Sequence, residues 1–432
     1  MKRLLSVTVL LAICLSRPAF AQSARRVQPL LGVGEVPATA SAAPEDPFFD
    51  DTLLQEIRLD INSKDWDTLK ENFLSNAYYP ADFHWGSQVV RNVGIRSRGT
   101  ASRSGVKPGL RVDFNRYADA QTFLGLKSFV LRNNATDFSN MHERVSMQLF
   151  RRTGSPAPRV AHTRLFVNGA YAGLYSIVES IDKDFLSRRL NDSDGVLYKY
   201  DRNVDDPPYR LEYLGADGAL YVPHPFKPET HESDPQPQPI ADLIRLVAES
   251  SEAAFRSSVG AFLDLAAFIK HVATEDFLAE TDGFLGDSGM NNFYLYRLAR
   301  QQMHVIIPWD KSESTKQGSA FSIFHNIDDV PVAMRNQLMA RVWKDDALYA
   351  LYLDALVACA NSASETIAGD GRGWMEREVD REYDQIRAAV LSDPAKSYSN
   401  DDFTAAVGAL RVFTQQRAEF VRSEVDRHRA DR

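Results

Sequence analysis

The residues best suited to chemistry lie in one segment of the chain, residues 280–310. It carries two carboxylates, Asp282 and Asp287, in a glycine-rich stretch that runs into a pair of amides ending at Asn292. A second apolar run then ends at Asp310. Carboxylate and amide oxygens are the ligands that Mg²⁺ prefers when it also binds the phosphates of a substrate. The segment therefore predicts metal-assisted phosphate transfer, with a loop carboxylate that orients a nucleophilic hydroxyl.

A tight hairpin is expected to bring these groups together. Residues 293–297 and 303–307 have the pattern of two short strands, and the outer ends of two such strands lie side by side. Asn292 and Asp310 then share one end of the hairpin, where they can hold Mg²⁺ or Mn²⁺. Spacing alone leaves both loop aspartates open for the role of orienting the hydroxyl.

The first half of the chain has the pattern of a small sheet with one helix. The strand candidates are residues 56–61, 89–98, 110–114, 126–131, 163–167 and 171–178. The last two are joined by Asn168-Gly169, a hairpin signal. The helix begins near Asp137 or Ser139, either of which can cap it, and ends by Gly154. The order predicts a small N-terminal lobe made mostly of strands.

The second half has the pattern of a larger, mostly helical lobe. Residues 202–239 are rich in proline and form a surface excursion. From Ile240 onward the chain is helical in pattern apart from the hairpin already described. Cys359 lies in an apolar stretch and is the one cysteine expected after removal of a leader, which excludes an intramolecular disulfide.

The N-terminus has the pattern of a secretory signal peptide that ends at Ala21. Lys2 and Arg3 precede an apolar run, residues 4–15, and residues 22–50 follow as a flexible linker. Removal of the leader would take the formal net charge from −8 to −11, and an acidic body without a basic run argues against nucleic-acid binding. We expect an exported protein, periplasmic, at the cell surface or extracellular, without stable membrane insertion after cleavage.

Several stretches resemble the spore-coat-H family of atypical kinases. They are Asp282-Gly283-Phe284, Asn291 to Tyr296, Ile307 to Asp310, and residues 93–99, 107–114 and 168–179. The resemblance runs from about Ile57 to about Ala350. It implies a divergent bilobal, protein-kinase-like α+β fold that transfers the γ-phosphate of ATP, with Mg²⁺ or Mn²⁺, to Ser or Thr of a protein or peptide acceptor. The implied segments are a signal peptide, linker, N-lobe and C-lobe at residues 1–21, 22–50, 51–181 and 182–432.

The resemblance also implies roles for the segment at 280–310. The family's catalytic aspartate falls on Asp282 by motif position, and its metal-binding aspartate falls on Asp310. Asp287 competes for the catalytic role, because its separation from Asn292 equals that of the catalytic aspartate and asparagine in ordinary kinases. We prefer Asp282 because it precedes the glycine-rich loop.

A bound nucleotide needs cations near its phosphates and a hinge near its adenine. Lys107 is the first choice and Arg111 the second, while Arg98 and its loop cover the phosphates. Glu143 on the helix either pairs with the lysine or is a solvated charge. Glu179 either lies at a hinge that binds adenine through backbone groups or forms an interlobe salt bridge.

Two other functions are consistent with the same sequence. One is a surface or adhesion module that kept the fold without catalysis, which an exported location favours because ATP is scarce there. The other is nucleotidyl transfer from ATP onto a protein or a cell-wall component. Retention of both Asp282 and Asp310 argues against the first of these.

Overall fold

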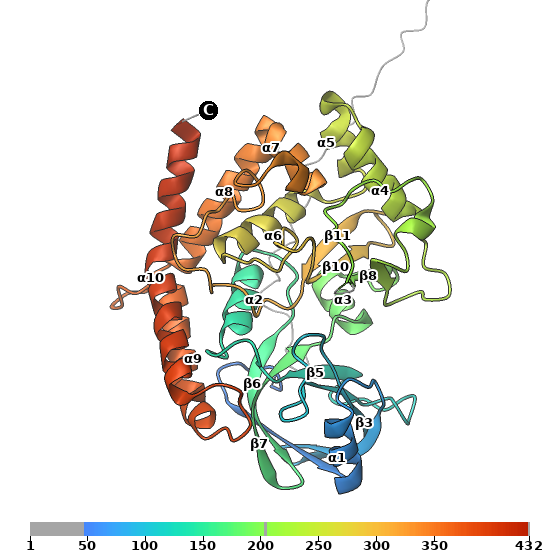
Figure 1. Ribbon diagram of the computed structural model, residues 1–432, viewed down its shortest axis with the longest axis vertical. Coiled ribbons are helices and arrows are strands. Elements are labelled where there is room, and N and C mark those ends of the chain that lie inside the picture. The colour runs from blue at the N-terminus through green and yellow to red at the C-terminus, as the bar shows by residue number, and fades with distance from the viewer. Residues whose placement is uncertain (1–46, 203–204, 431–432) are drawn as a thin grey trace, which may run out of the picture. The chain divides into compact units, whose positions relative to one another are not determined.

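The computed structural model describes residues 47–202 and 205–430, which form a mixed α+β structure (Figure 1). The expected signal peptide and almost all of the expected linker lie outside these residues. In Figure 1 the first strands, coloured blue to green, lie below a second sheet and the helices that follow it. Among the described residues, no helix is both long enough and apolar enough to cross a membrane.

The N-terminal strands close into a barrel in the order β1-β2-β3-β4-β5-β7-β6. They are β1 (Gln55–Ile61), β2 (Tyr79–Trp85), β3 (Gln88–Ser97), β4 (Leu110–Asp113), β5 (Ser128–Arg132), β6 (Val160–Val167) and β7 (Ala170–Glu179). Apolar residues alternate along β1 and point inward. The interior contains edge-to-face pairs of buried phenylalanine rings, including Phe48 with Phe129, and such rings contribute much of a core's buried area.

The expected small N-terminal sheet is closed into a barrel, because β1 pairs in parallel with β6. Ile57 lies opposite Leu165 across this seam. Closure leaves neither strand with an unpaired edge. Closure of the barrel could not be predicted from the sequence, because β2 contains Pro80 and lacks a clear alternation. In addition, β1 and β6, which pair at the seam, are far apart in the chain.

Two helices accompany the barrel, α1 (Ser63–Glu71) and α2 (His142–Arg152). Neither expected residue is the N-cap of α2, which is Met141 and makes no side-chain cap hydrogen bond. Asp137 and Ser139 lie just before it, where Oδ2 of Asp137 accepts from the backbone N–H of His142 at 2.9 Å and the hydroxyl of Ser139 accepts from that of Met141. The helix ends before Gly154, as predicted. It is buried along most of its length, including Glu143 and Arg144.

A second sheet has the order β11-β10-β8-β9. Its strands are β8 (Val196–Tyr200), β9 (Phe226–Pro228), β10 (Phe293–Arg297) and β11 (His304–Pro308). The predicted hairpin is confirmed, since Phe293 lies opposite Pro308 at its open end. The sequence did not indicate β8 and β9, because β9 is a short strand inside the proline-rich excursion.

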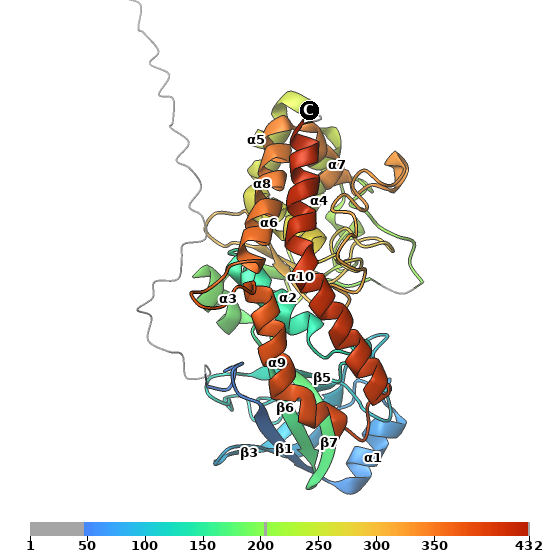
Figure 2. The same cartoon turned by 90° about the vertical axis from the view of Figure 1, so that its left-hand side faces the viewer.

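The remaining elements are helical. They are α3 (Lys183–Leu190), η1 (Gly218–Leu220), α4 (Gln238–Glu249), α5 (Glu252–Gly260), α6 (Leu265–Phe277), η2 (Val332–Met334), α7 (Gln337–Lys344), α8 (Asp346–Ala363), α9 (Trp374–Leu391) and α10 (Asn400–Ala430). The central helix α6 packs on α8 and is almost wholly buried. Figure 2 shows α9 and α10 running along one side, with α9 reaching the barrel strands β6 and β7. There the hydroxyl of Tyr171 donates to the carbonyl of Ala389.

Candidate active site

A cavity of about 600 Å³ lies between the barrel and the second sheet. Its walls come from the loop after β3, the end of β5, the end of β8, the loop before β10 and the segment after β11. The charged residues that line it are Arg96, Arg98, Arg103, Arg132, Lys199, Asp201, Arg202, Asp282, Asp310 and Glu313. Cations outnumber carboxylates, so the cavity suits an anionic ligand.

The loop before β10 holds one carboxylate between two amides. Asn292 donates through Nδ2 to Oδ2 of Asp282 at 2.8 Å and to its backbone carbonyl at 3.0 Å. Asn291 donates to Oδ1 of Asp282 at 2.9 Å. Burial raises the pKa of Asp282, and the hydrogen bond from Asn291 offsets this only in part. A carboxylate held in this way has a fixed orientation and an increased basicity.

The backbone bends at the two ends of the hairpin. Asn292 and Asp310 have φ values of 55° and 49°, in the left-handed region that residues other than glycine seldom adopt. The backbone N–H of Trp309 donates to the carbonyl of Asn292 at 3.1 Å and ties the two ends together. Both side chains line the cavity. Such backbone conformations persist where the surroundings enforce them, and they are enriched at functional sites.

Arg132, at the end of β5, bridges two carboxylates. Its Nη1 lies 2.6 Å from Oδ2 of Asp310, and its Nε lies 2.7 Å from Oε2 of Glu143. Burial alone would raise the pKa of Asp310, but the charge and hydrogen bond of Arg132 lower it to about 2. For Glu143, burial outweighs the attraction of Arg132 and raises the pKa to about 7. Asp310 is therefore ionised at neutral pH, as a metal ligand must be.

Arg98 faces the same cavity without a partner. Its guanidinium lies 5.8 Å from the ring centroid of Trp309, which also carries the guanidinium of Arg132 at 5.2 Å. Within the part of the chain that the structure describes, the Arg98 side chain makes no hydrogen bond or ion pair. Burial and the neighbouring charge of Arg132 lower the pKa of Arg98 to about 10. An unpaired and partly desolvated cation favours an anionic ligand.

A buried ion pair supports the cavity from behind. Lys311, next to Asp310, donates to Oε1 of Glu275 at 2.6 Å and to the carbonyl of Asn292 at 3.2 Å. Oε2 of Glu275 accepts from the backbone N–H of Phe284 at 2.8 Å. A Cβ on Gly283 would lie 2.5 Å from this carboxylate, so a side chain does not fit there. Glu275 of α6 thus fixes both the loop and the segment after β11.

Comparison with known proteins identifies a family for the chain. A model of the family described as "CotH kinase protein" matches residues 95–421. The chain belongs to the CotH kinase protein family. It is 24% identical over 371 residues to the inner spore coat protein H of Bacillus subtilis (strain 168), covering 85% of this chain and 96% of that protein. The resemblance seen in the sequence is therefore confirmed.

A solved kinase structure shares a weak likeness with this CotH-family chain. The proinflammatory kinase CtkA of Helicobacter pylori is 10% identical, and the alignment covers 74% of this chain and 95% of that one. The TM-score is 0.29.

The structure places the predicted site residues of this CotH-family chain in two groups. Asp282, Asn292, Asp310 and Arg98 line the cavity together. Asp287 lies outside the cavity lining, where its Oδ1 contacts His325 at 2.5 Å and Asn326 at 2.8 Å. Its side chain is 54% exposed. Asp287 is therefore not close to the metal candidates, whereas Asp282 is bonded to Asn292.

The expected phosphate-binding cations need correction. Lys107 does not line this cavity, because its Nζ is buried in an ion pair with Asp393 at 2.7 Å. Arg111 does not line it either, and it donates to Ser128 at 2.9 Å. Glu143 pairs with Arg132 and is buried, so it is neither paired with a lysine nor a solvated charge.

Glu179 forms salt bridges, the kind of contact named in its second interpretation. Its carboxylate accepts from the side chain of Arg159 at 2.7 Å and from that of Arg188 at 2.6 Å. It also accepts from the backbone N–H of Arg159. Because the carboxylate is buried and saturated with donors, Glu179 forms a salt bridge between β7 and its neighbours.

Arg132 is the functional candidate that the sequence reasoning missed. It ends an apolar strand, and the helix that carries Glu143 follows directly. In protein kinases a strand lysine and a glutamate of the following helix form an ion pair in the same order. A cation at the end of the strand before α2 was thus the available signal.

Proposed function

We propose that this CotH-family chain is an ATP-dependent protein kinase whose reaction takes place in the cavity between the barrel and the second sheet. The observation that carries the proposal is that Asp282, Asn292 and Asp310 line one cavity together with the unpaired Arg98. The barrel and the helical part would act as two lobes, residues 51–181 and 182–432, with the nucleotide between them.

The donor set fits a hard divalent cation, Mg²⁺ or Mn²⁺, bound together with phosphates. No group of three or more His, Cys, Asp or Glu side chains in the described residues could hold a metal by itself. Asn292 and Asp310 supply oxygen ligands, and no described residue donates a hydrogen bond to Oδ1 of Asn292. Mg²⁺ is commonly held by one or two carboxylates plus the phosphates of its substrate. When bound, it would neutralise the charge of the transferring phosphate.

Arg98 and Arg132 would hold the phosphates of ATP. Arg132 takes the place that a strand lysine has in protein kinases, since it pairs with the helix glutamate, Glu143. An arginine offers a planar fork of donors, so it can contact a phosphate while it keeps its two carboxylates. Its Nη2 is buried without a hydrogen-bond partner in the described residues, which leaves a donor for a phosphate oxygen.

Asp282 would orient the acceptor hydroxyl and take up its proton. The hydroxyl oxygen forms the new bond to the γ-phosphorus as the bond from phosphorus to the β,γ-bridging oxygen breaks, and ADP leaves with that electron pair. The proton passes to Asp282 and then to water. The fixed orientation and raised pKa of the Asp282 carboxylate suit this task. The proposed acceptor is Ser or Thr of a protein or peptide.

The test uses γ-labelled ATP, Mg²⁺ or Mn²⁺, and a serine-rich acceptor protein. The wild-type chain should transfer label, and Asp310→Ala should abolish transfer. Intact mass of the acceptor separates phosphate transfer from nucleotidyl transfer, because a phosphate adduct and an AMP adduct differ in mass. If the wild type neither transfers a group nor binds ATP, the non-catalytic surface module becomes the better account.

We also propose export, on the basis of the N-terminal sequence pattern. Cleavage after Ala21 would leave a mature chain that begins at Gln22. Fractionation of the source cells followed by N-terminal sequencing tests this. A cytoplasmic protein that begins at Met1 would contradict it.

A further inference from the structure

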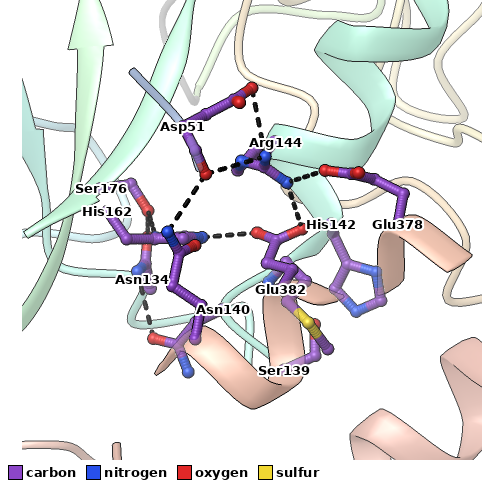
Figure 3. Close-up of polar contacts among 12 residues, drawn as sticks. Asp51, Asn134, Ser139, Asn140, His142, Arg144, His162, Ser176, Glu378 and Glu382 are labelled. Carbon is purple, nitrogen blue, oxygen red and sulfur yellow. Dashed lines mark hydrogen bonds and ion pairs between the residues drawn. The ribbon is translucent and has the colours of Figure 1, made fainter. Parts of the chain in front are cut away.

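The helix α2 has charged groups on two sides. Glu143 points to Arg132 and the cavity, whereas the next residue, Arg144, points into a buried network (Figure 3). Its Nη1 lies 2.5 Å from Oε1 of Glu378 and 2.9 Å from Oε2 of Glu382, both on α9. Side chains of Arg144 and Glu382 are fully buried. The guanidinium is therefore a rigid connection between α2 and α9.

Hydrogen bonds continue from this connection to the cavity wall. Oε1 of Glu382 lies 2.5 Å from Nε2 of His162, whose Nδ1 lies 3.3 Å from the hydroxyl of Ser176. That hydroxyl donates to Oδ1 of Asn134 at 3.1 Å. Asn134 lines the cavity. Figure 3 shows this path running from α9 through β6 and β7.

A second connection joins the segment after α9 to the loop between β3 and β4. Oδ2 of Asp393 accepts from Lys107 at 2.7 Å and from the backbone N–H of Leu174 at 2.9 Å. A Cβ on Gly173 would lie 2.6 Å from this carboxylate, so the glycine makes room for it. Tyr398 extends the contact, because its hydroxyl accepts from Asn140 at 2.6 Å, just before α2.

Because both residues lie on one helix, the connection from Arg144 to α9 also affects Glu143. Neighbouring residues project about 100° apart around the axis, so the orientation that satisfies Arg144 also sets the direction of Glu143. Buried ion pairs contribute little net stability compared with apolar packing of equal volume, because desolvation offsets their attraction. Three acidic contacts on one guanidinium, from Asp51, Glu378 and Glu382, therefore fix position more than they stabilise the fold.

We propose that α9 and the segment after it are a built-in positioning element for the active site. By holding Arg144 and Lys107, they keep Glu143 against Arg132 and keep the loop between β3 and β4 at the cavity before a nucleotide binds. In protein kinases the position of the corresponding helix is a point of control by the activation loop. Here the protein's own C-terminal part supplies that control. The effect on catalysis rests on the proposed kinase function, whereas the effect on α2 does not.

The main test compares Arg144→Met with a control of equal size, Arg341→Met. Arg341 is also anchored by two hydrogen bonds, to the carbonyls of Val247 and Ser250, but it lies on α7. In the full chain, hydrogen exchange should show that Arg144→Met loses protection in α2 while α7 and α8 keep theirs. Arg341→Met should leave α2 protected, even if the two variants lower Tm equally. Unchanged protection of α2 in Arg144→Met would overturn the proposal, whether or not the protein binds ATP.

Nucleotide binding gives the second readout. Arg144→Met should raise the Kd for ATP about tenfold, within the usual range for coupling between two sites, and Arg144→Lys should restore part of the affinity. If Arg144→Met does not fold, the double variant Glu378→Gln, Glu382→Gln serves instead, because it keeps the acceptor oxygens and removes the charge. An ATP affinity equal to wild type in a variant with exposed α2 would overturn the link to the site. Absence of ATP binding by the wild type would contradict the proposed function alone.

Discussion

Asn292 donates the same side-chain amide to Asp282 twice, at 2.8 Å to the carboxylate and at 3.0 Å to the backbone carbonyl. One residue thus fixes both the orientation of the carboxylate and the loop that carries it. The carbonyl oxygen of the same Asn292 side chain remains available to a ligand in the cavity. The arrangement connects the proposed base to the proposed metal ligand, so we expect a substitution at Asn292 to affect both functions.

The two loop aspartates should differ in their effect on catalysis. Asp282→Asn should lower kcat by about 10²-fold or more, the usual contribution of a general base, and leave the Kd for ATP within a few-fold. Asp287→Asn should change kcat little, because Asp287 contacts His325 and Asn326 away from the cavity. Label transfer at saturating ATP checks both. The reverse order of effects would assign the catalytic role to Asp287.

Arg98 should contribute to binding of the phosphates and not of the nucleoside. A hydrogen bond to a charged group is worth about 1.5–3 kcal/mol, so Arg98→Met should raise the Kd for ATP by about tenfold or more. The Kd for adenosine should change by less than about twofold. The matched control is Arg91→Met, since Arg91 lies on β3, the strand directly before Arg98, but is 82% exposed. Equal losses of affinity for ATP and for adenosine would show that Arg98→Met distorts the cavity.

Gly283 should tolerate no side chain. Gly283→Ala would place a Cβ 2.5 Å from the carboxylate of Glu275, which also holds Lys311. We expect a loss of about 1–3 kcal/mol in the free energy of unfolding, as for other overpacked sites, together with reduced kcat. Urea unfolding and label transfer measure the two effects. Gly408→Ala is the control, because a Cβ there meets nothing within 4 Å and the residue lies inside α10.

Glu280 should make stability depend on pH. Burial raises its pKa from the ordinary 4.5 to about 8, and the charge of Lys311 offsets this only in part. Because the folded state binds the proton more tightly, the contribution to stability is complete below about pH 4.5 and is lost as pH rises through about 8, with a slope of up to about 1.4 kcal/mol per pH unit.

Glu280→Gln removes this titration and keeps an acceptor for the backbone N–H of Asp282. The free energy of unfolding of the variant should therefore rise relative to wild type between pH 5 and pH 8. Denaturant unfolding at several pH values measures the difference. A constant difference across this range would mean that the carboxyl of Glu280 does not titrate there.

The hairpin and the residues at its end could be predicted from the sequence because the information is local. Asn292 and Asp310 are separated by two short apolar strands, and strand pairing brings them together without help from the rest of the chain. The turn at Asn168-Gly169 is local in the same sense. Motif position also favoured Asp282 over Asp287, in agreement with the hydrogen bond to Asn292.

The cations could not be predicted in the same way, because their partners are distant in the chain. Lys107 lies in a loop of small and basic residues, which is typical of a phosphate-binding loop, but Asp393 is 286 residues away and sequesters it. Arg132 ends a strand whose pairing with β7 depends on closure of the barrel. Alternation along one strand indicates which side chains point inward, and it does not say which strand faces the second sheet.

The connection between Arg144 and Glu382 also orders events during synthesis of the chain. A ribosome makes the barrel, α2 and the hairpin well before it reaches α9, so the first two-thirds of the protein emerge with Arg144 still lacking its two glutamates. If α9 is required as proposed, a nascent chain cannot be active until α9 has been translated and has left the ribosome.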